Sequence, residues 1–406
     1  MPFDPRRSPS PGDADTVPAR ATKGRIETGL RRIGRGLVRA GLPPSWLDWH
    51  AIVSEAPLAR PGDPRVEVLQ PPERATGPLP RNIESRAALS GDRGWWGFSR
   101  RDVPDRAVAP TRLVRIRNAT LVAFRSAEKN NYEIGLLDGR GRAIHLPQIR
   151  FGPRHAAVLR RRPPVRRVAR ALWIAERCYD NHSHWLTAHL PKLVFLSERD
   201  MLADLAFPAR RGATIDASLA ALGLNTDGWT AMAPMTAFKV EALEVLVTDR
   251  FRPSLLDAVR AAHLPPVPPL RRRRVLVSRR SARGRRLLGE DALWPELEAR
   301  GFERVEMERL DYAAQVRLMQ EAAILVAPHG AGLTNMIFAP PGLHVVEIAD
   351  ASYPNPNFYA LAAAMGHPYW LIEAEGVGNS HPLDRDLQVA PEAVVSVVAR
   401  IEAETE

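Results

Sequence analysis

The residues best suited to chemistry in this sequence stand in the stretch APHGAGLTN, at 327–335. His329 supplies a side-chain donor, and Gly330 and Gly332 let the backbone turn tightly and approach a ligand. The stretch follows an apolar strand pattern and precedes a short helical one, so its amides would stand at a helix N-terminus, which attracts anions. A tight turn that simply needs glycine would have the same sequence. The predicted anion site comprises His329, Gly330, Ala331, Gly332, Thr334 and Asn335.

Three further candidates, Ser278, Arg279 and Arg280, follow the apolar run VLV of a predicted strand at 273–279. Arginine offers permanent, planar and bidentate recognition of phosphate, so Arg279 and Arg280 are candidate ligands of an anion. The arginines at 271–273 precede the apolar run and are better explained as a solvated basic face.

A single carboxylate, Glu347, interrupts the apolar strand pattern HVVEIA at 344–349. In dinucleotide-binding folds an acidic residue near a strand end accepts hydrogen bonds from ribose hydroxyls. A helix cap or an ion pair between loops would use the same residue type. Glu347 is therefore a candidate ligand-binding residue, with the structural alternative open.

These candidates must be positioned by the strand and helix patterns that alternate through the second half of the chain. Alternating units of this length predict a parallel, doubly wound sheet, which binds ligands outside the carboxyl ends of its strands. All the candidates fall at that edge. Pro328 and the turn APPG break the charge-free run 322–346, which excludes a membrane span there. Strands are predicted at 273–279, 304–310, 323–328, 344–349 and 368–373, and helices at 290–301, 311–322, 332–338, 357–366 and 391–404.

The first half of the chain has weaker patterns. Strands are predicted between 111 and 149, with a DG turn at Asp138, and again at 166–176 before a helix that starts near Asn181. The chain is too long for one hydrophobic core. The expected parts are a disordered tail with a basic helix at 1–45, an irregular covering segment at 46–110, an N-terminal domain at 111–255 and a C-terminal domain at 256–406.

The basic helix of the tail, at 24–39, is amphipathic. Such a helix either lies on an anionic membrane surface or packs its apolar stripe on the protein. The N-terminus has no apolar segment after its basic residues, so no secretory signal is predicted. The expected location is the cytoplasm, with peripheral contact at the inner face of the plasma membrane as the alternative.

Composition narrows the class of protein. Apolar residues make up 45% of the chain, as in soluble globular proteins, and Cys178 is the single cysteine, which suits a reducing compartment. The net charge of +11, from 57 Lys and Arg against 46 Asp and Glu, suggests anionic partners or merely a GC-rich genome. Cys178, His182 and His184 lack a fourth ligand at a familiar spacing, so no metal site is predicted.

The stretches VLVSRRSARGRRLLGEDAL, APHGAGLTNMIFAPPGLHVVEI and NHSHWLTAHLPKL together resemble glycosyltransferase family 61, which is also met as capsular polysaccharide biosynthesis protein. The resemblance covers roughly residues 110–375 and is strongest at 275–348. It implies a GT-B architecture, with two Rossmann-like doubly wound domains facing across a cleft, and a small β unit is expected in the N-terminal half. It also implies a nucleotide-sugar donor on the C-terminal domain and an inverting transfer that requires no metal.

An inverting transfer needs a general base, and the family places this function near the HWL motif. Here His184 and Asp180 are the candidate catalytic residues, with His182 as a further local candidate. The family commonly has an acidic residue three positions after the Trp, where this chain has Ala188. The related EQ pair is also altered, to Ala314 and Gln315. The departure at Ala188 leaves two alternatives, another base or impaired catalysis.

The sequence therefore predicts a glycosyltransferase that uses a nucleotide diphosphate sugar as co-substrate, needs no other cofactor, and acts on a glycan or lipid-linked glycan in bacterial surface polysaccharide synthesis. A relative that binds nucleotide sugar or glycan without turnover is the main alternative. A nucleic-acid-binding protein is disfavoured, because aromatic residues are only 6% of the chain. The sugar, the acceptor and the oligomeric state stay open.

Overall fold

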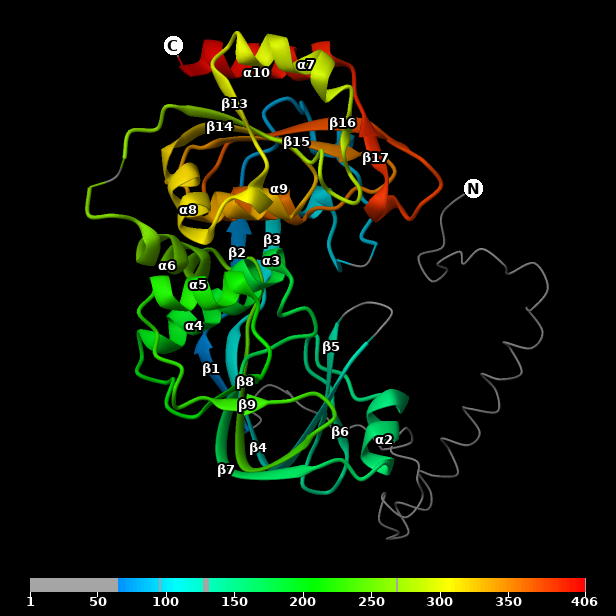
Figure 1. Ribbon diagram of the computed structural model, residues 1–406, viewed down its shortest axis with the longest axis vertical. Coiled ribbons are helices and arrows are strands. Elements are labelled where there is room, and N and C mark those ends of the chain that lie inside the picture. The colour runs from blue at the N-terminus through cyan, green and yellow to red at the C-terminus, as the bar shows by residue number, and fades with distance from the viewer. Residues whose placement is uncertain (1–64, 95, 127–130, 268, 406) are drawn as a thin grey trace, which may run out of the picture.

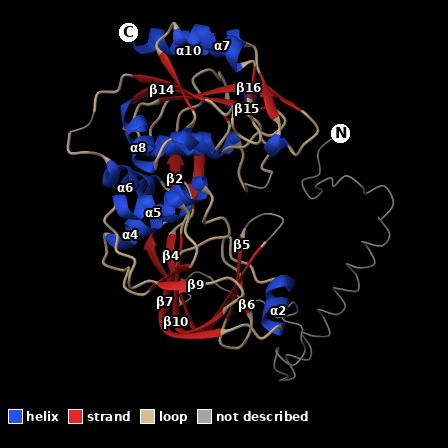
Figure 2. Cartoon of the chain, viewed as in Figure 1, coloured by secondary structure: helices blue, strands red, loops and turns tan. Residues whose placement is uncertain are grey.

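A computed structural model describes residues 65–94, 96–126, 131–267 and 269–405. Two lobes are stacked along the long axis, each built on a large sheet, and a layer of helices lies between them (Figure 1). Helices also cover the outer face of the C-terminal sheet (Figure 2). The predicted tail and its helix at 24–39 lie outside the described residues.

The C-terminal lobe has a seven-stranded sheet in the order β12-β17-β16-β15-β14-β11-β13. Its neighbouring strands are parallel except for β16 and β17, which confirms the predicted parallel sheet. Chain order reverses beside β11, because β13 lies on one side of it and β14 on the other. The strands are β11 (Arg273–Val277), β12 (Leu287–Leu288), β13 (Phe302–Val305), β14 (Ala322–Pro328), β15 (His344–Asp350), β16 (Tyr369–Val377) and β17 (Asp386–Gln388).

Helices cover both faces of this sheet. On the outer face lie α7 (Glu290–Glu298) and α10 (Pro391–Thr405), and on the inner face lie α8 (Tyr312–Glu321), α9 (Asn357–Ala364) and a 3-10 helix at Ala331–Phe338 (Figure 1). Local signals explain their ends. Asp311 caps α8 by accepting a hydrogen bond from the backbone of Ala314, as predicted, and Gly301 has a φ of +74° after α7.

The strand predicted at 304–310 is wrong after its first two residues. β13 ends at Val305, and Met307–Arg309 form one 3-10 turn. The side-chain amide of Gln315 donates to the carbonyls of Met307 and Leu310, so these groups are satisfied without a neighbouring strand.

The N-terminal lobe has an eight-stranded sheet that is mixed, not the doubly wound parallel sheet expected for this half. β4 pairs antiparallel with β1, β5 and β10, and only β10, β7, β8 and β9 run parallel. The short connections from β4 to β5 and from β5 to β6 explain the difference, because they can join only antiparallel strands. The predicted DG turn at Asp138 makes the second of them. The strands are β1 (Val66–Gln70), β4 (Thr111–Arg125), β5 (Tyr132–Leu137), β6 (Ala143–Ile144), β7 (Val165–Trp173), β8 (Leu205–Pro208), β9 (Thr230–Met232) and β10 (Ala237–Val247).

The segment predicted to be irregular contributes strands as well. Besides β1, it forms β2 (Glu73–Thr76) and β3 (Asp105–Val108), which make a separate two-stranded sheet. Many side chains in β1 and β2 are exposed or half-buried, so they lack the apolar alternation that marks a strand. The ion pair of Arg106 with Asp249 ties β3 to the N-terminal lobe.

Helices fill the space between the two sheets and join their cores. One buried apolar cluster extends from Val240 of β10 through Leu256 of α6 to Val345 of β15. The intervening helices are α3 (His182–His184), a π-helical turn at Trp185–His189, α4 (Leu190–Ser197), α5 (Ala213–Ala221) and α6 (Pro253–His263), while α2 (Pro153–Arg160) lies at the far end of the N-terminal lobe. Within the described residues, no helix is long and apolar enough to cross a membrane.

Candidate functional site

A cavity of about 690 Å³ lies between the two lobes, where the helical layer meets the carboxyl edge of the C-terminal sheet. The N-terminal lobe lines it with α3 and α5, and the C-terminal lobe with the loop after β11, the turn before α8 and the first residues of the helix after β14. Its polar lining consists of His182, Thr214, Arg279, Ser281, Arg283, Glu308, Asp311, Tyr312, Gln315 and Asn335.

Sheet topology brings the two main sequence motifs to this cavity. β11 and β14 are parallel neighbours, with Leu276 opposite Val326, so the loops after them leave the sheet side by side. β11 is also the strand beside which chain order reverses, and such a switch point is where doubly wound sheets bind ligands. Arg279 and the glycine turn, some fifty residues apart in the chain, therefore meet.

The contact between Arg279 and Gly330 is close. A β-carbon added at Gly330 would lie 2.5 Å from Nη1 of Arg279 and 3.1 Å from its Cζ. Gly330 itself has an extended φ of 174°, so its importance is steric and does not depend on a left-handed backbone. Gly332 is also packed tightly, with Met307 and Val277 each 3.3 Å from such a β-carbon. Because Gly330 has no side chain, the guanidinium of Arg279 can pack directly against the backbone of the turn.

Arg279 carries a positive charge that no carboxylate of the described residues neutralises by an ion pair. Its Nη2 donates to the carbonyl of Gly284 at 3.0 Å, and its Nε is buried without a hydrogen-bond partner. Burial, and then the neighbouring Arg285, lower the pKa of Arg279 to about 10. The guanidinium therefore stays charged at neutral pH, held beside the cavity with unused hydrogen-bonding capacity.

His329 is held by a buried network behind the turn. Its Nδ1 is hydrogen-bonded to Oε1 of Glu347, and Tyr369 donates its hydroxyl to Oε2 of the same carboxylate at 2.5 Å. Burial lowers the pKa of His329, which favours a neutral ring. Burial alone would raise the pKa of Glu347, but His329 and Arg100 outweigh it and keep the carboxylate charged. Glu347 is fully buried with both oxygens engaged, so this geometry favours an orienting role, and the predicted ribose contact stays a prediction.

Asn335 joins the turn to the N-terminal lobe. Its side-chain nitrogen donates to the carbonyl of Gly332 at 3.2 Å, which directs its Oδ1 toward Nε2 of His182 at 3.1 Å. His182 must then donate from Nε2, so its Nδ1 carries the lone pair, 3.5 Å from the hydroxyl of Thr214. Burial lowers the pKa of His182, which favours the neutral ring. A neutral imidazole thus lines the cavity, with its Nδ1 lone pair toward the hydroxyl of Thr214.

Several predicted anion ligands lie outside the cavity lining. Ser278 is buried and donates to Glu290 at 2.8 Å, so it ties the loop after β11 to the start of α7. Arg280 is half-exposed and pairs with Asp291 at 2.8 Å. Thr334 is fully buried beneath the turn, and its hydroxyl oxygen has no hydrogen-bond partner. By contrast, Ala331, Gly332 and Asn335 line the cavity, and no side chain in the described part of the chain caps the N-terminus of their helix.

The two predicted catalytic residues are not brought to the cavity lining. Asp180 forms an ion pair with Arg125, at 2.9 Å. His184 lies one helical turn after Asp180. Its backbone NH donates to the side-chain oxygen of Asn181, and its backbone carbonyl is hydrogen-bonded to the ring of His189. Burial, and then Arg250, hold the pKa of His184 well below its ordinary value. His182, two residues earlier, is the member of this segment that reaches the cavity.

Ala188 lies in the π-helical turn and is only 2% exposed. The guanidinium of Arg250 donates to the hydroxyls of Thr187, at 2.6 Å, and Ser183, at 2.8 Å. An acidic side chain at this position would therefore be buried in the helical layer. A described carboxylate that interacts with Arg250 is Glu176, which forms an ion pair with Lys192.

Sequence reasoning missed Arg285. It lies in the same loop as Arg279, has a φ of +57°, and has its pKa lowered mainly by burial. Its positive charge lowers the pKa of Arg279, so the two guanidiniums reinforce one positive region at the edge of the sheet. The run RGRR after the predicted strand was the available signal, but the pattern does not show which arginine folds inward.

Comparison with known proteins finds one family model and several relatives that match part of this chain. The family model described as Glycosyltransferase 61 matches residues 182–346, which begin at His182 and end within β15. An EGF domain-specific O-linked N-acetylglucosamine transferase of Drosophila melanogaster is 34% identical over 95 residues, 23% of this chain and 18% of that protein. A beta-1,2-xylosyltransferase of Oryza sativa subsp. japonica is 36% identical over 62 residues, 15% and 12% of the two chains.

A beta-1,2-xylosyltransferase of Arabidopsis thaliana is 36% identical over 55 residues, 14% of this chain and 10% of that protein. Each alignment thus spans less than a fifth of the relative's own length. The family match contains the histidine, the arginine loop and the glycine turn that meet at the cavity. Residues 182–346 of this chain thus match the family model of glycosyltransferase 61.

Proposed function

We propose that this protein transfers a sugar from a nucleotide diphosphate sugar to a hydroxyl of a glycan or lipid-linked glycan, with inversion at the anomeric carbon. The observation that carries the proposal is Arg279, a charged guanidinium without a carboxylate partner among the described residues. It packs against Gly330 at the switch point of a parallel sheet. A diphosphate leaving group develops negative charge as the sugar departs. Fixed cations in a partly dehydrated site stabilise such charge.

Arg279, Arg285 and the uncapped helix that begins at Ala331 would supply this stabilisation, so we propose a transfer that requires no metal. The Glu347–His329 pair would hold the turn in shape from behind. The enclosed position between the lobes lets the protein align donor and acceptor, which is a large part of catalysis for two-substrate reactions.

His182 is the proposed general base. Its Nδ1 takes the proton of the acceptor hydroxyl while that oxygen forms a bond to the anomeric carbon. The bond from the anomeric carbon to the diphosphate oxygen breaks, and its electron pair stays on the diphosphate beside Arg279. Asn335 fixes the required tautomer, because its own orientation is set by Gly332. This assignment replaces the acidic residue that is absent at Ala188.

The names of the relatives suggest two donors to test, the nucleotide diphosphate sugars that carry N-acetylglucosamine and xylose. None of these names refers to a capsule. A role in bacterial surface polysaccharide synthesis is therefore proposed from the sequence resemblance alone, as is a cytoplasmic location.

A thermal-shift screen of nucleotide sugars tests the donor site. We expect a stabilising donor to lose most of its effect on Arg279→Ala, because charge-assisted hydrogen bonds to phosphate contribute about 1.5–3 kcal/mol. Arg280→Ala is the matched control, since it removes the adjacent arginine, which pairs with Asp291 outside the cavity. The donor-site assignment is wrong if both variants respond like the unchanged protein.

Turnover separates the enzyme from the catalytically impaired alternative. With the stabilising donor and a panel of glycan acceptors, sugar transfer or donor hydrolysis supports the enzyme. Donor binding that never leads to either reaction would assign the protein to the alternative, a nucleotide-sugar-binding relative.

A further inference from the structure

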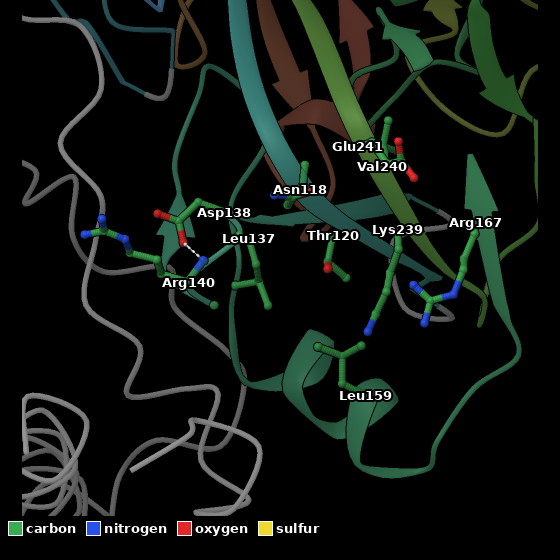
Figure 3. Close-up of a pocket in the computed structure, with 13 residues that line it drawn as sticks. Asn118, Thr120, Leu137, Asp138, Arg140, Leu159, Arg167, Lys239, Val240 and Glu241 are labelled. Atoms are coloured by element: carbon green, nitrogen blue, oxygen red, sulfur yellow. Dashed lines mark hydrogen bonds between the residues drawn. The ribbon is translucent and has the colours of Figure 1, made fainter. Parts of the chain in front are cut away.

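A second cavity, of about 730 Å³, lies in the N-terminal lobe between the sheet and helix α2. Helix α2 and strands β4 and β7, which contribute residues to its lining, lie at the end of the molecule far from β14 (Figure 1). Figure 3 shows Thr120, Lys239 and Arg167 pointing into the same space, toward Leu159 of α2. The proposed transfer does not use these residues.

Sheet register places the three side chains in one row. Thr120 of β4 is the antiparallel partner of Lys239 of β10, and Lys239 is the parallel partner of Arg167 of β7. Directly paired residues share a face of the sheet, so a hydroxyl, an ammonium and a guanidinium stand side by side across three strands. Like charges directly opposite each other destabilise a sheet unless something compensates them.

Among the described residues, no carboxylate forms an ion pair with Lys239 or Arg167. Neither Lys239 nor Arg167 takes part in the side-chain hydrogen bonds or ion pairs found among them. Asp138 also lines the cavity, but its carboxylate is bonded to the Arg142 side chain and to the backbone of Arg140. Glu241, on the same strand as Lys239, is exposed at the cavity and pairs with neither cation.

The rest of the lining matches a saccharide better than a polyphosphate. Glu241 offers carboxylate oxygens and Asn118 an amide, and both bind hydroxyl groups. An inorganic polyphosphate chain has no hydroxyl groups for these acceptors to bind. The lining has no aromatic side chain on which nucleic-acid bases could stack.

We infer that this cavity binds an acidic sugar unit, with the anionic group held by Lys239, Arg167 and Thr120. The inference rests on the proposed function, because it makes the cavity a remote subsite for the glycan acceptor. It would favour acidic acceptor chains long enough to reach beyond the transfer site. An anion between the two cations also removes the repulsion that the sheet register creates.

Binding of a hexameric oligogalacturonide, measured by calorimetry on the full chain, tests the inference, with cellohexaose as the neutral probe of equal length. The variant Lys239→Gln with Arg167→Gln should bind oligogalacturonide about tenfold more weakly or worse, as expected when two charge-assisted contacts are lost. The control, Arg166→Gln with Arg170→Gln, removes the same net charge from β7 residues that do not line the cavity, and its affinity should stay within about twofold.

Equal oligogalacturonide affinity in the two double variants would overturn the inference, as would equal affinity of the unchanged protein for cellohexaose. Phosphatidylglycerol vesicles and a single-stranded oligonucleotide are measured in parallel. If either binds more tightly than the saccharide and is lost in the cavity variant alone, the row serves a lipid surface or a nucleic acid and the saccharide assignment is wrong. Both double variants should show the same donor-induced thermal shift as the unchanged protein. Failure of the proposed donor site is therefore measured apart from failure of the saccharide site.

Discussion

His182 is held in one tautomer, and this predicts a pH profile. A base works as the neutral ring, and burial lowers the pKa of His182 below the ordinary 6.5. Turnover should therefore be constant near neutral pH and fall only on the acid side of 6.5, measured as kcat from pH 4.5 to 8. His182→Gln should lower kcat by about 10²–10⁴-fold, the usual contribution of a general base. His344→Gln, away from the cavity beside Trp370, is the control. An unchanged kcat in His182→Gln would exclude the role.

The roles of some single residues could not be predicted from the sequence. Arg279 and Arg280 are adjacent and chemically identical, and both follow the same strand, so residue type alone predicts the same role for each. The loop after β11 turns one against Gly330 and leaves the other with Asp291 on the surface. Likewise, the partners of Glu347 come from two other segments, at His329 and Tyr369, and only the folded sheet brings them together.

The turn between β14 and its helix is the element that carries the donor site, and Gly330→Ala tests it. The added methyl group would overlap Arg279 and push the guanidinium from its place. We expect donor affinity, measured by calorimetry, to fall about tenfold or more, the equivalent of one charge-assisted contact. Gly228→Ala is the control, because a β-carbon there meets nothing within 4 Å. Wild-type affinity in Gly330→Ala would show that Arg279 can move without loss.

Elements of the C-terminal lobe were predictable because each buried parallel strand is a short apolar run closed by Gly, Pro or a capping residue. β11, β14 and β15 match their predicted ranges to within two residues, while β16 begins as predicted but extends to Val377. The π-helical turn at Trp185–His189 had no such signal. Its geometry depends on tertiary contacts, among them the hydrogen bond from the backbone of Glu176 to the ring of His189.

At the scale of the whole molecule, the two lobes share one apolar core, and the transfer cavity forms where both contribute side chains. Such a site cannot be seen in either half of the sequence alone, which is why His182 and Asn335 were found separately and not as a pair. The mixed N-terminal sheet was missed for a similar reason, since its central strand β4 takes partners from before and after it in the chain.

Buried neutral histidines distributed over the whole molecule predict that it loses stability in mild acid. Burial lowers the pKa of His155, His189 and His367 to about 4 each. Unfolding restores a value near 6.5, so between pH 6.5 and 4 the unfolded chain binds more protons. Stability is complete above this window and should fall by ~1.4 kcal/mol per pH unit for each histidine as pH drops through it.

Urea unfolding between pH 5 and 6.5 measures the slope before most carboxylates titrate. His155 packs against Phe124 and Phe151, so His155→Phe keeps an aromatic ring there. The variant should reduce the slope by ~1.4 kcal/mol per pH unit, whatever the substitution does to the free energy of unfolding at pH 8. A free energy of unfolding that is constant from pH 5 to 7 would mean that these rings accept protons inside the folded protein.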